Sequence, residues 1–62
     1  MKRRDLVRHL ELMGCALSRD GGRQSWWQHQ ESGKRSAVPR HREIDDQLVR
    51  KICKDLGIEA PR

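Results

Sequence analysis

The sequence of 62 residues predicts an α+β domain with three antiparallel strands between two helices, in the order α-β-β-β-α. Apolar residues recur with helical spacing near both ends of the chain, whereas the middle alternates with the period of a strand and is divided by glycine-containing turns. Short hairpin turns require antiparallel pairing, and both helices are then expected on one face of the sheet. We expect one domain that comprises residues 1–62.

The first helix is predicted over residues 3–13. Leu6, Leu10 and Met13 recur with helical spacing and form an apolar stripe, and charged residues occupy the other sides. Gly14 provides the stop, because glycine accepts the left-handed conformation that commonly follows a helix.

The three strands are predicted over residues 15–19, 23–29 and 34–39. The expected turns between them are Asp20-Gly21-Gly22 and Glu31-Ser32-Gly33, and Pro39 ends the third strand. In the second strand, alternation places Gln24, Trp26 and Gln28 on one face and Ser25, Trp27 and His29 on the other. The two tryptophans either pack in the core and across strands or provide a stacking surface for an unpaired base.

The last helix begins after Asp45, a good N-cap, and is expected to end at Gly57. Its apolar stripe consists of Leu48, Val49, Ile52, Cys53 and Leu56. Cys15 and Cys53 both have apolar neighbours and are expected to be buried, small apolar side chains. The spacing of the cysteines and histidines does not match a zinc site, so no metal or other cofactor is expected.

The charge favours a polyanionic partner. Fourteen Lys and Arg against nine Asp and Glu give a net charge of +5, and the basic residues cluster near the N-terminus and between Lys34 and Arg42. The alternative is a solvated basic face without a ligand. The chain has no apolar run of the roughly 18 residues that a membrane helix needs, and its first residues do not form a secretory signal.

Three segments carry a resemblance to a known family: GGRQSWW (21–27), SAVPRHREI (36–44) and VRKICKDLGI (49–58). In this order, and together with the opening KRRDLVRHLELMGC, they closely resemble the HicA toxins, the RNA-cleaving toxins of HicA–HicB type II toxin–antitoxin systems. The resemblance implies a fold similar to the double-stranded-RNA-binding domain. It also implies cleavage of single-stranded messenger RNA in the cytoplasm, a toxin that is monomeric alone, and a hetero-oligomer with a neutralising HicB-type antitoxin.

One position departs from the family pattern. HicA-type toxins depend on a histidine just after the glycine-rich turn, where this chain has Gln24. An imidazole titrates near neutral pH and can shuttle a proton, whereas an amide cannot, so we expect impaired catalysis. Gln24 is either an introduced or selected inactivating substitution, which we favour, or the mark of a degenerate toxin. His29 is expected on the opposite face about 16 Å along the strand and does not replace the missing group.

The predicted site therefore has Gln24 at the catalytic position and RNA-binding residues around it. These are Gly21, Gly22, Arg23, Ser25, Trp27, Lys34, Arg35, Arg40 and His41. The two glycines either let a phosphate approach the backbone or only shape the hairpin, and His41 is either a substrate contact or a surface loop residue. About five cationic contacts predict a log–log salt slope near −3.5 on single strands. Alternatives are a non-catalytic RNA-binding module of the same fold and an interaction protein for an acidic partner.

Overall fold

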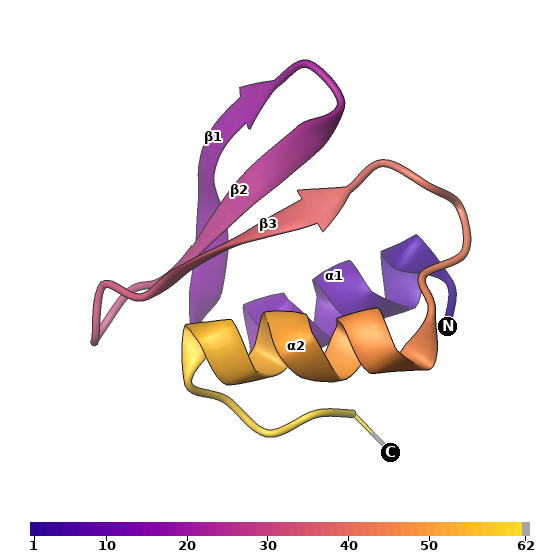
Figure 1. Ribbon diagram of the computed structural model, residues 1–62. Coiled ribbons are helices and arrows are strands. Elements are labelled where there is room, and N and C mark those ends of the chain that lie inside the picture. The colour runs from indigo at the N-terminus through magenta and orange to yellow at the C-terminus, as the bar shows by residue number, and fades with distance from the viewer. Residues whose placement is uncertain (62) are drawn as a thin grey trace.

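The computed structural model describes residues 1–61 and has the predicted α-β-β-β-α order (Figure 1). The elements are α1 (Arg3–Leu12), β1 (Cys15–Gly21), β2 (Gln24–His29), β3 (Arg35–Pro39) and α2 (Asp46–Leu56). The strands form one antiparallel sheet in the order β1-β2-β3, so β2 is central. The predicted fold class is confirmed.

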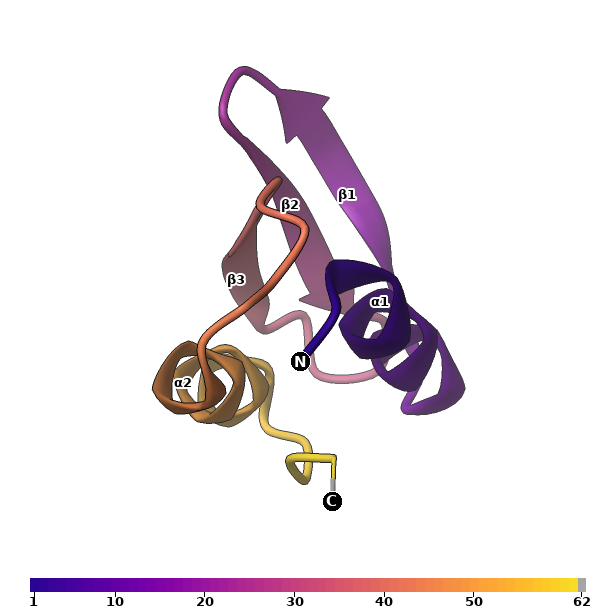
Figure 2. The same ribbon diagram turned by 90° about the vertical axis from the view of Figure 1, so that its right-hand side faces the viewer.

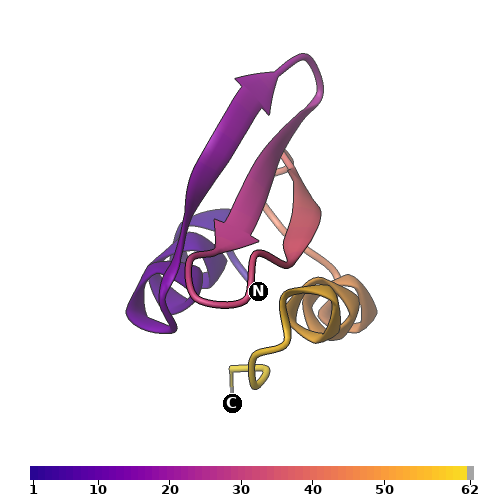
Figure 3. The ribbon, with the colours of Figure 1, turned by 90° about the vertical axis from the view of Figure 1, so that its left-hand side faces the viewer.

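Both helices cover the same face of the sheet. They lie side by side, and Figure 2, which views them nearly end-on, shows α1 beneath β1 and α2 beneath β3. Their stripes share one core with the inward side chains of the sheet: Leu6, Leu10, Cys15, Trp27, Val38, Ile44, Val49, Ile52, Cys53 and Leu56. The opposite face of the sheet, nearer the viewer in Figure 3, carries no helix in the described part of the chain.

The helix ends follow the predicted chemistry. The Asp45 side chain accepts a hydrogen bond from the backbone N–H of Gln47 at 3.2 Å, which caps the first turn of α2. Gly57 has φ +71° and accepts no other residue without strain, so it ends the helix as expected. Gly14 plays the same part after α1, with φ +88°.

The first hairpin differs from the prediction. β1 continues to Gly21 because the register shifts between Leu17 and Arg19, as in a β-bulge, and the turn moves to Gly22-Arg23. Gly22 has φ +57°, the conformation that favours glycine at the first position of a two-residue hairpin turn. The tip of this hairpin projects beyond both helices in all three views (Figures 1–3). Gly22, Arg23 and Gln24 at this tip are therefore exposed.

Candidate functional site

Gln24 is the first residue of β2, and its side chain is exposed at the projecting end of the hairpin. It pairs with Gly21 of β1 on one side and with Pro39 of β3 on the other. The two flanking strands thus hold the backbone of Gln24 from both sides, while its side chain is free to contact a ligand.

The register defines what surrounds Gln24 on the open face, because directly paired residues lie on the same face. Arg19, Trp26 and Ala37 form the next row across the three strands, and Arg35 pairs with Gln28 in the row beyond. Glycine and alanine in these rows leave space between the larger side chains.

Two adjoining hollows occupy that space. The larger, about 690 Å³, is lined by Arg19, Gly21, Gly22, Arg23, Gln24 and Trp26. The smaller, about 260 Å³, is lined by Ser18, Arg19, Trp26 and Arg35. Arg19 and Trp26 belong to both, so the hollows meet at this pair. We call the residues of the two hollows the open-face patch; it combines three arginines with an aromatic ring and has no acidic lining residue.

A hydrogen-bond network braces the end of the sheet behind Gln24. The hydroxyl of Ser25 donates to Asp20 at 3.0 Å and accepts from the guanidinium of Arg3 at 3.2 Å. Arg3 also donates to the carbonyl of Pro39 at 3.0 Å, and Arg40 forms an ion pair with Asp20. The network joins α1 to all three strands and neutralises the one carboxylate near the hairpin tip.

The structure corrects two of the sequence-based assignments, those of Ser25 and Trp27. Ser25 and Trp27 are only 3% and 6% exposed, because both face the helices, and neither has the surface for direct contact with RNA. Lys34 lies at the other end of β3, where its side chain approaches Gly57 at the end of α2. Arg40 is half-exposed and engaged by Asp20. Burial removes Ser25 and Trp27 from the surface that RNA can reach. Lys34 and Arg40 are exposed, and their role in RNA binding stays a prediction.

The remaining assignments are divided between the patch and its surroundings. Gly21, Gly22, Arg23 and Arg35 line the patch beside Gln24. His41 is exposed in the segment that follows β3 and lines neither hollow. His29 is at the far end of β2 and faces the turn, where its Nδ1 accepts from the N–H of Ser32 at 3.2 Å.

Sequence reasoning omitted three patch residues, Ser18, Arg19 and Trp26. Trp27 was assigned in place of its neighbour, although the alternation of β2 already put Trp26 on the same face as Gln24. Arg19 could not be found from alternation alone, because the bulge after Leu17 reverses the phase of β1.

A second cationic surface lies at the start of α1. Lys2, Arg3, Arg4 and Arg42 line a hollow of about 370 Å³, and the N–H of Arg3 donates to the carbonyl of Arg42 at 2.8 Å. Arg3 joins this basic cradle to the braced end of the sheet, because its guanidinium reaches Ser25 and Pro39. The two cationic surfaces are thus linked through one side chain.

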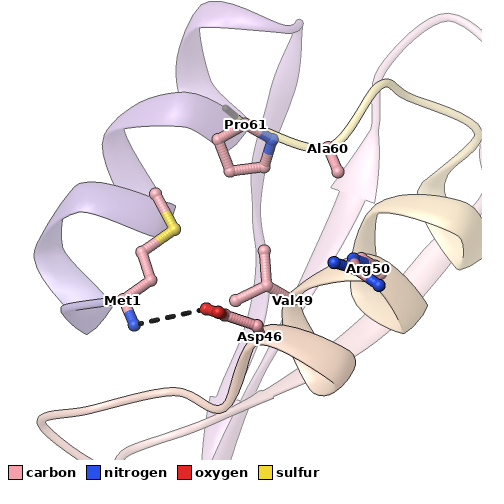
Figure 4. Close-up of a pocket in the computed structure, with 6 residues that line it drawn as sticks. All are labelled: Met1, Asp46, Val49, Arg50, Ala60 and Pro61. Atoms are coloured by element: carbon pink, nitrogen blue, oxygen red, sulfur yellow. Dashed lines mark ion pairs between the residues drawn. The ribbon is translucent and has the colours of Figure 1, made fainter.

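A further hollow, of about 380 Å³, lies between the chain ends and α2 (Figure 4). It is lined by Met1, Asp46, Val49, Arg50, Ala60 and Pro61, and the Met1 amine lies 3.8 Å from the Asp46 carboxylate. None of the predicted site residues lines it. The ion pair between Met1 and Asp46 anchors the start of the chain to α2.

Neither thiol suits nucleophilic catalysis. Cys15 and Cys53 are 5% and 1% exposed, and burial raises the pKa of each thiol above its ordinary value. Both observations oppose formation of an accessible thiolate. Within residues 1–61, no group of three or more His, Cys, Asp and Glu is arranged to hold a metal ion, and no helix is long and apolar enough to cross a membrane.

Comparison with known proteins gives one match. Residues 3–58 match the family model described as "HicA toxin of bacterial toxin-antitoxin". Searches of curated proteins and of solved structures gave no significant match. The match includes all five structural elements and the complete open-face patch.

Proposed function

The chain belongs to the HicA toxin family, the RNA-cleaving toxins of toxin–antitoxin systems, and on that premise we propose that it binds messenger RNA with impaired cleavage. Gln24 occupies the position of the proton-transferring histidine in this proposal. The observation that carries it is that Gln24 is exposed and lines a hollow together with Arg19 and Arg23.

The chemistry explains the impairment. Metal-free RNA cleavage needs a base to take the 2′-hydroxyl proton and an acid to protonate the leaving oxygen. The amide of Gln24 can donate and accept hydrogen bonds but does not titrate near neutral pH, so it cannot act as a general acid or base. Loss of a general acid–base group costs on the order of 10²–10⁴-fold in rate, so slow cleavage remains compatible with tight binding.

The surroundings of Gln24 suit a phosphodiester. Arg19 and Arg23 can balance the charge of the bound phosphate and the additional charge that develops in the transition state. Within the described chain, no heavy atom from beyond the neighbouring residues lies within 4 Å of the position that a Cβ would take at Gly21 or Gly22, so the space beside this turn is open to a ligand. The ion pair of Asp20 with Arg40 shields the nearest carboxylate from the phosphate.

The partner in this proposal is a HicB-type antitoxin that covers the cationic surfaces and so excludes RNA. The free chain is then a monomer, the inhibited form is a hetero-oligomer, and both act in the cytoplasm where messenger RNA is translated. The net charge of +5 supports an antitoxin surface that is acidic where it meets the patch.

The test is the substitution Gln24→His. We expect purified Q24H to cleave single-stranded RNA on the order of 10²–10⁴-fold faster than the parent chain and to arrest growth when expressed. Gln28→His is the matched control, because Gln28 lies further along β2 on the same face and undergoes the same chemical change. The assignment of Gln24 would be refuted if Q28H cleaves RNA as fast as Q24H, or if neither variant cleaves faster than the parent chain.

The second candidate is a non-catalytic RNA-binding module. It is favoured by the presence of an exposed aromatic ring and three arginines in a patch that has no proton-transferring side chain. RNA binding by the parent chain, together with an inert Q24H variant, would select this alternative.

A further inference from the structure

Trp26 is the one tryptophan whose ring reaches the open face. Its side chain is 39% exposed, whereas Trp27 is 6% exposed and packs in the core. Large aromatic side chains are usually buried or used in binding, so a ring held at the surface by the central strand calls for an explanation.

The flanks of Trp26 suit a flat ligand. Arg19 pairs with it on one side, while Ala37 on the other is too small to cover the ring. The hollow bounded by Ser18, Arg19, Trp26 and Arg35 is about 260 Å³, the space of roughly nine water molecules. A nucleobase has a comparable number of heavy atoms, and the two guanidinium groups can contact the phosphates attached to it.

We propose that Trp26, Arg19 and Arg35 form a subsite that stacks one unpaired RNA base, next to the nucleotide held at Gln24. This inference rests on the proposed function, because it assumes that RNA occupies the open-face patch. Trp26 and Gln24 lie two residues apart on one face of β2, about 6.6 Å along the strand. This separation is comparable to one nucleotide step in an extended chain, and the hollows meet at Trp26 and Arg19.

The stacked base has a role in positioning. Cleavage by a 2′-hydroxyl requires attack in line with the leaving oxygen, and this geometry is poorly populated while consecutive bases stack on each other. A base held against Trp26 is separated from its neighbour, so the sugar–phosphate between them turns toward Gln24. Holding reactants in such an arrangement is a major source of catalytic rate. The subsite therefore selects single strands over duplexes.

The test measures binding of the parent chain to a single-stranded RNA octamer, and to the same octamer with one abasic nucleotide placed at each position in turn. We expect Trp26→Ala to weaken binding of the intact octamer about 5- to 150-fold, which corresponds to the loss of one stacked base. Trp26→Phe keeps most of the affinity, because its ring still stacks. Leu12→Ala is the control, since Leu12 is 79% exposed at the end of α1, outside the patch.

The abasic series separates stacking from folding. The parent should lose affinity at one abasic position, and that position dependence should disappear in Trp26→Ala. Equal binding by the parent and Trp26→Ala would overturn the subsite and leave the proposed function intact. The subsite would also be overturned, with the proposed function intact, if Trp26→Ala weakens binding to a HicB-type antitoxin but not binding to RNA. No RNA binding by the parent would overturn both proposals.

Discussion

Arg19 provides the sharpest electrostatic prediction, because it is the cation shared by the two hollows of the patch. The perturbation is Arg19→Ala. Its partner across the strands is Trp26, and no hydrogen bond or ion pair of the Arg19 side chain is found in the described structure, so the fold should survive the change.

The magnitude follows from counting cations in the patch. Three arginines line it, Arg19, Arg23 and Arg35, and each phosphate contact on a single strand contributes about −0.7 to the log–log salt slope. A tetranucleotide confined to the patch should give a slope of about −2.1, and Arg19→Ala should give about −1.4. Between 50 and 200 mM salt, affinity then falls about 18-fold for the parent and about 7-fold for the variant.

This slope is smaller than the sequence alone predicted, because three of the five expected cations do not line the patch. Lys34 lies near Gly57 at the end of α2, Arg40 is paired with Asp20, and Arg42 belongs to the basic cradle. The assay is fluorescence anisotropy of a labelled tetranucleotide at several salt concentrations. Lys54→Ala is the control, since Lys54 is exposed in the last turn of α2 and should leave the slope unchanged. A parent slope near zero, or an identical slope for Arg19→Ala, would refute this account of the patch.

Three other perturbations test the framework. Gly22→Ala should lower the free energy of unfolding by about 1–2 kcal/mol because of its positive φ, whereas Gly21→Ala should change it by less than about 0.5 kcal/mol; urea titration compares them. Burial raises the pKa of both thiols, so the unfolded chain loses its thiol protons at lower pH than the folded chain does. The free energy of unfolding should therefore fall as pH rises above about 8.5, which urea denaturation at a series of pH values measures. A free energy of unfolding that rises above this pH would contradict the prediction. Arg40→Ala should lower the free energy of unfolding by less than about 1 kcal/mol, yet it should weaken RNA binding because it exposes the Asp20 carboxylate. Adding Asp20→Asn to the Arg40→Ala variant should restore binding, and an unchanged affinity of Arg40→Ala for RNA would exclude this shielding role.

Local chemistry was sufficient to predict most of the fold. The stripes of α1 and α2, the Asp45 cap and the terminating glycines each specify their structure over a few residues, and all agree with one arrangement. The first hairpin was less predictable. Asp20-Gly21-Gly22 has the composition of a turn, yet the bulge after Leu17 extends β1 and makes Asp20 a strand residue that pairs with Ser25.

The candidate site was predicted in position but only partly in composition. Gln24 and its neighbouring turn follow from the motif, whereas the direction in which Ser25 and Trp27 point depends on which face the helices cover. Either tryptophan could fill an apolar position in the core, so residue type alone did not show which of them is buried. Long-range partners also decide which cations are free. The pairing of Arg40 with Asp20, 20 positions apart in the chain, is not visible in the local sequence.

We assign Gln24 to the position of a proton carrier, and the sharpest check of this assignment is the pH dependence of RNA cleavage by Q24H under single-turnover conditions. Cations near an imidazole at this position favour its neutral form, so we expect the restored rate to rise with pH through a transition at or below the ordinary histidine pKa of about 6.5. The parent and Gln24→Ala should both show negligible cleavage with no such transition. If the parent cleaves as fast as Q24H, or if the Q24H rate does not vary with pH, Gln24 does not hold that position.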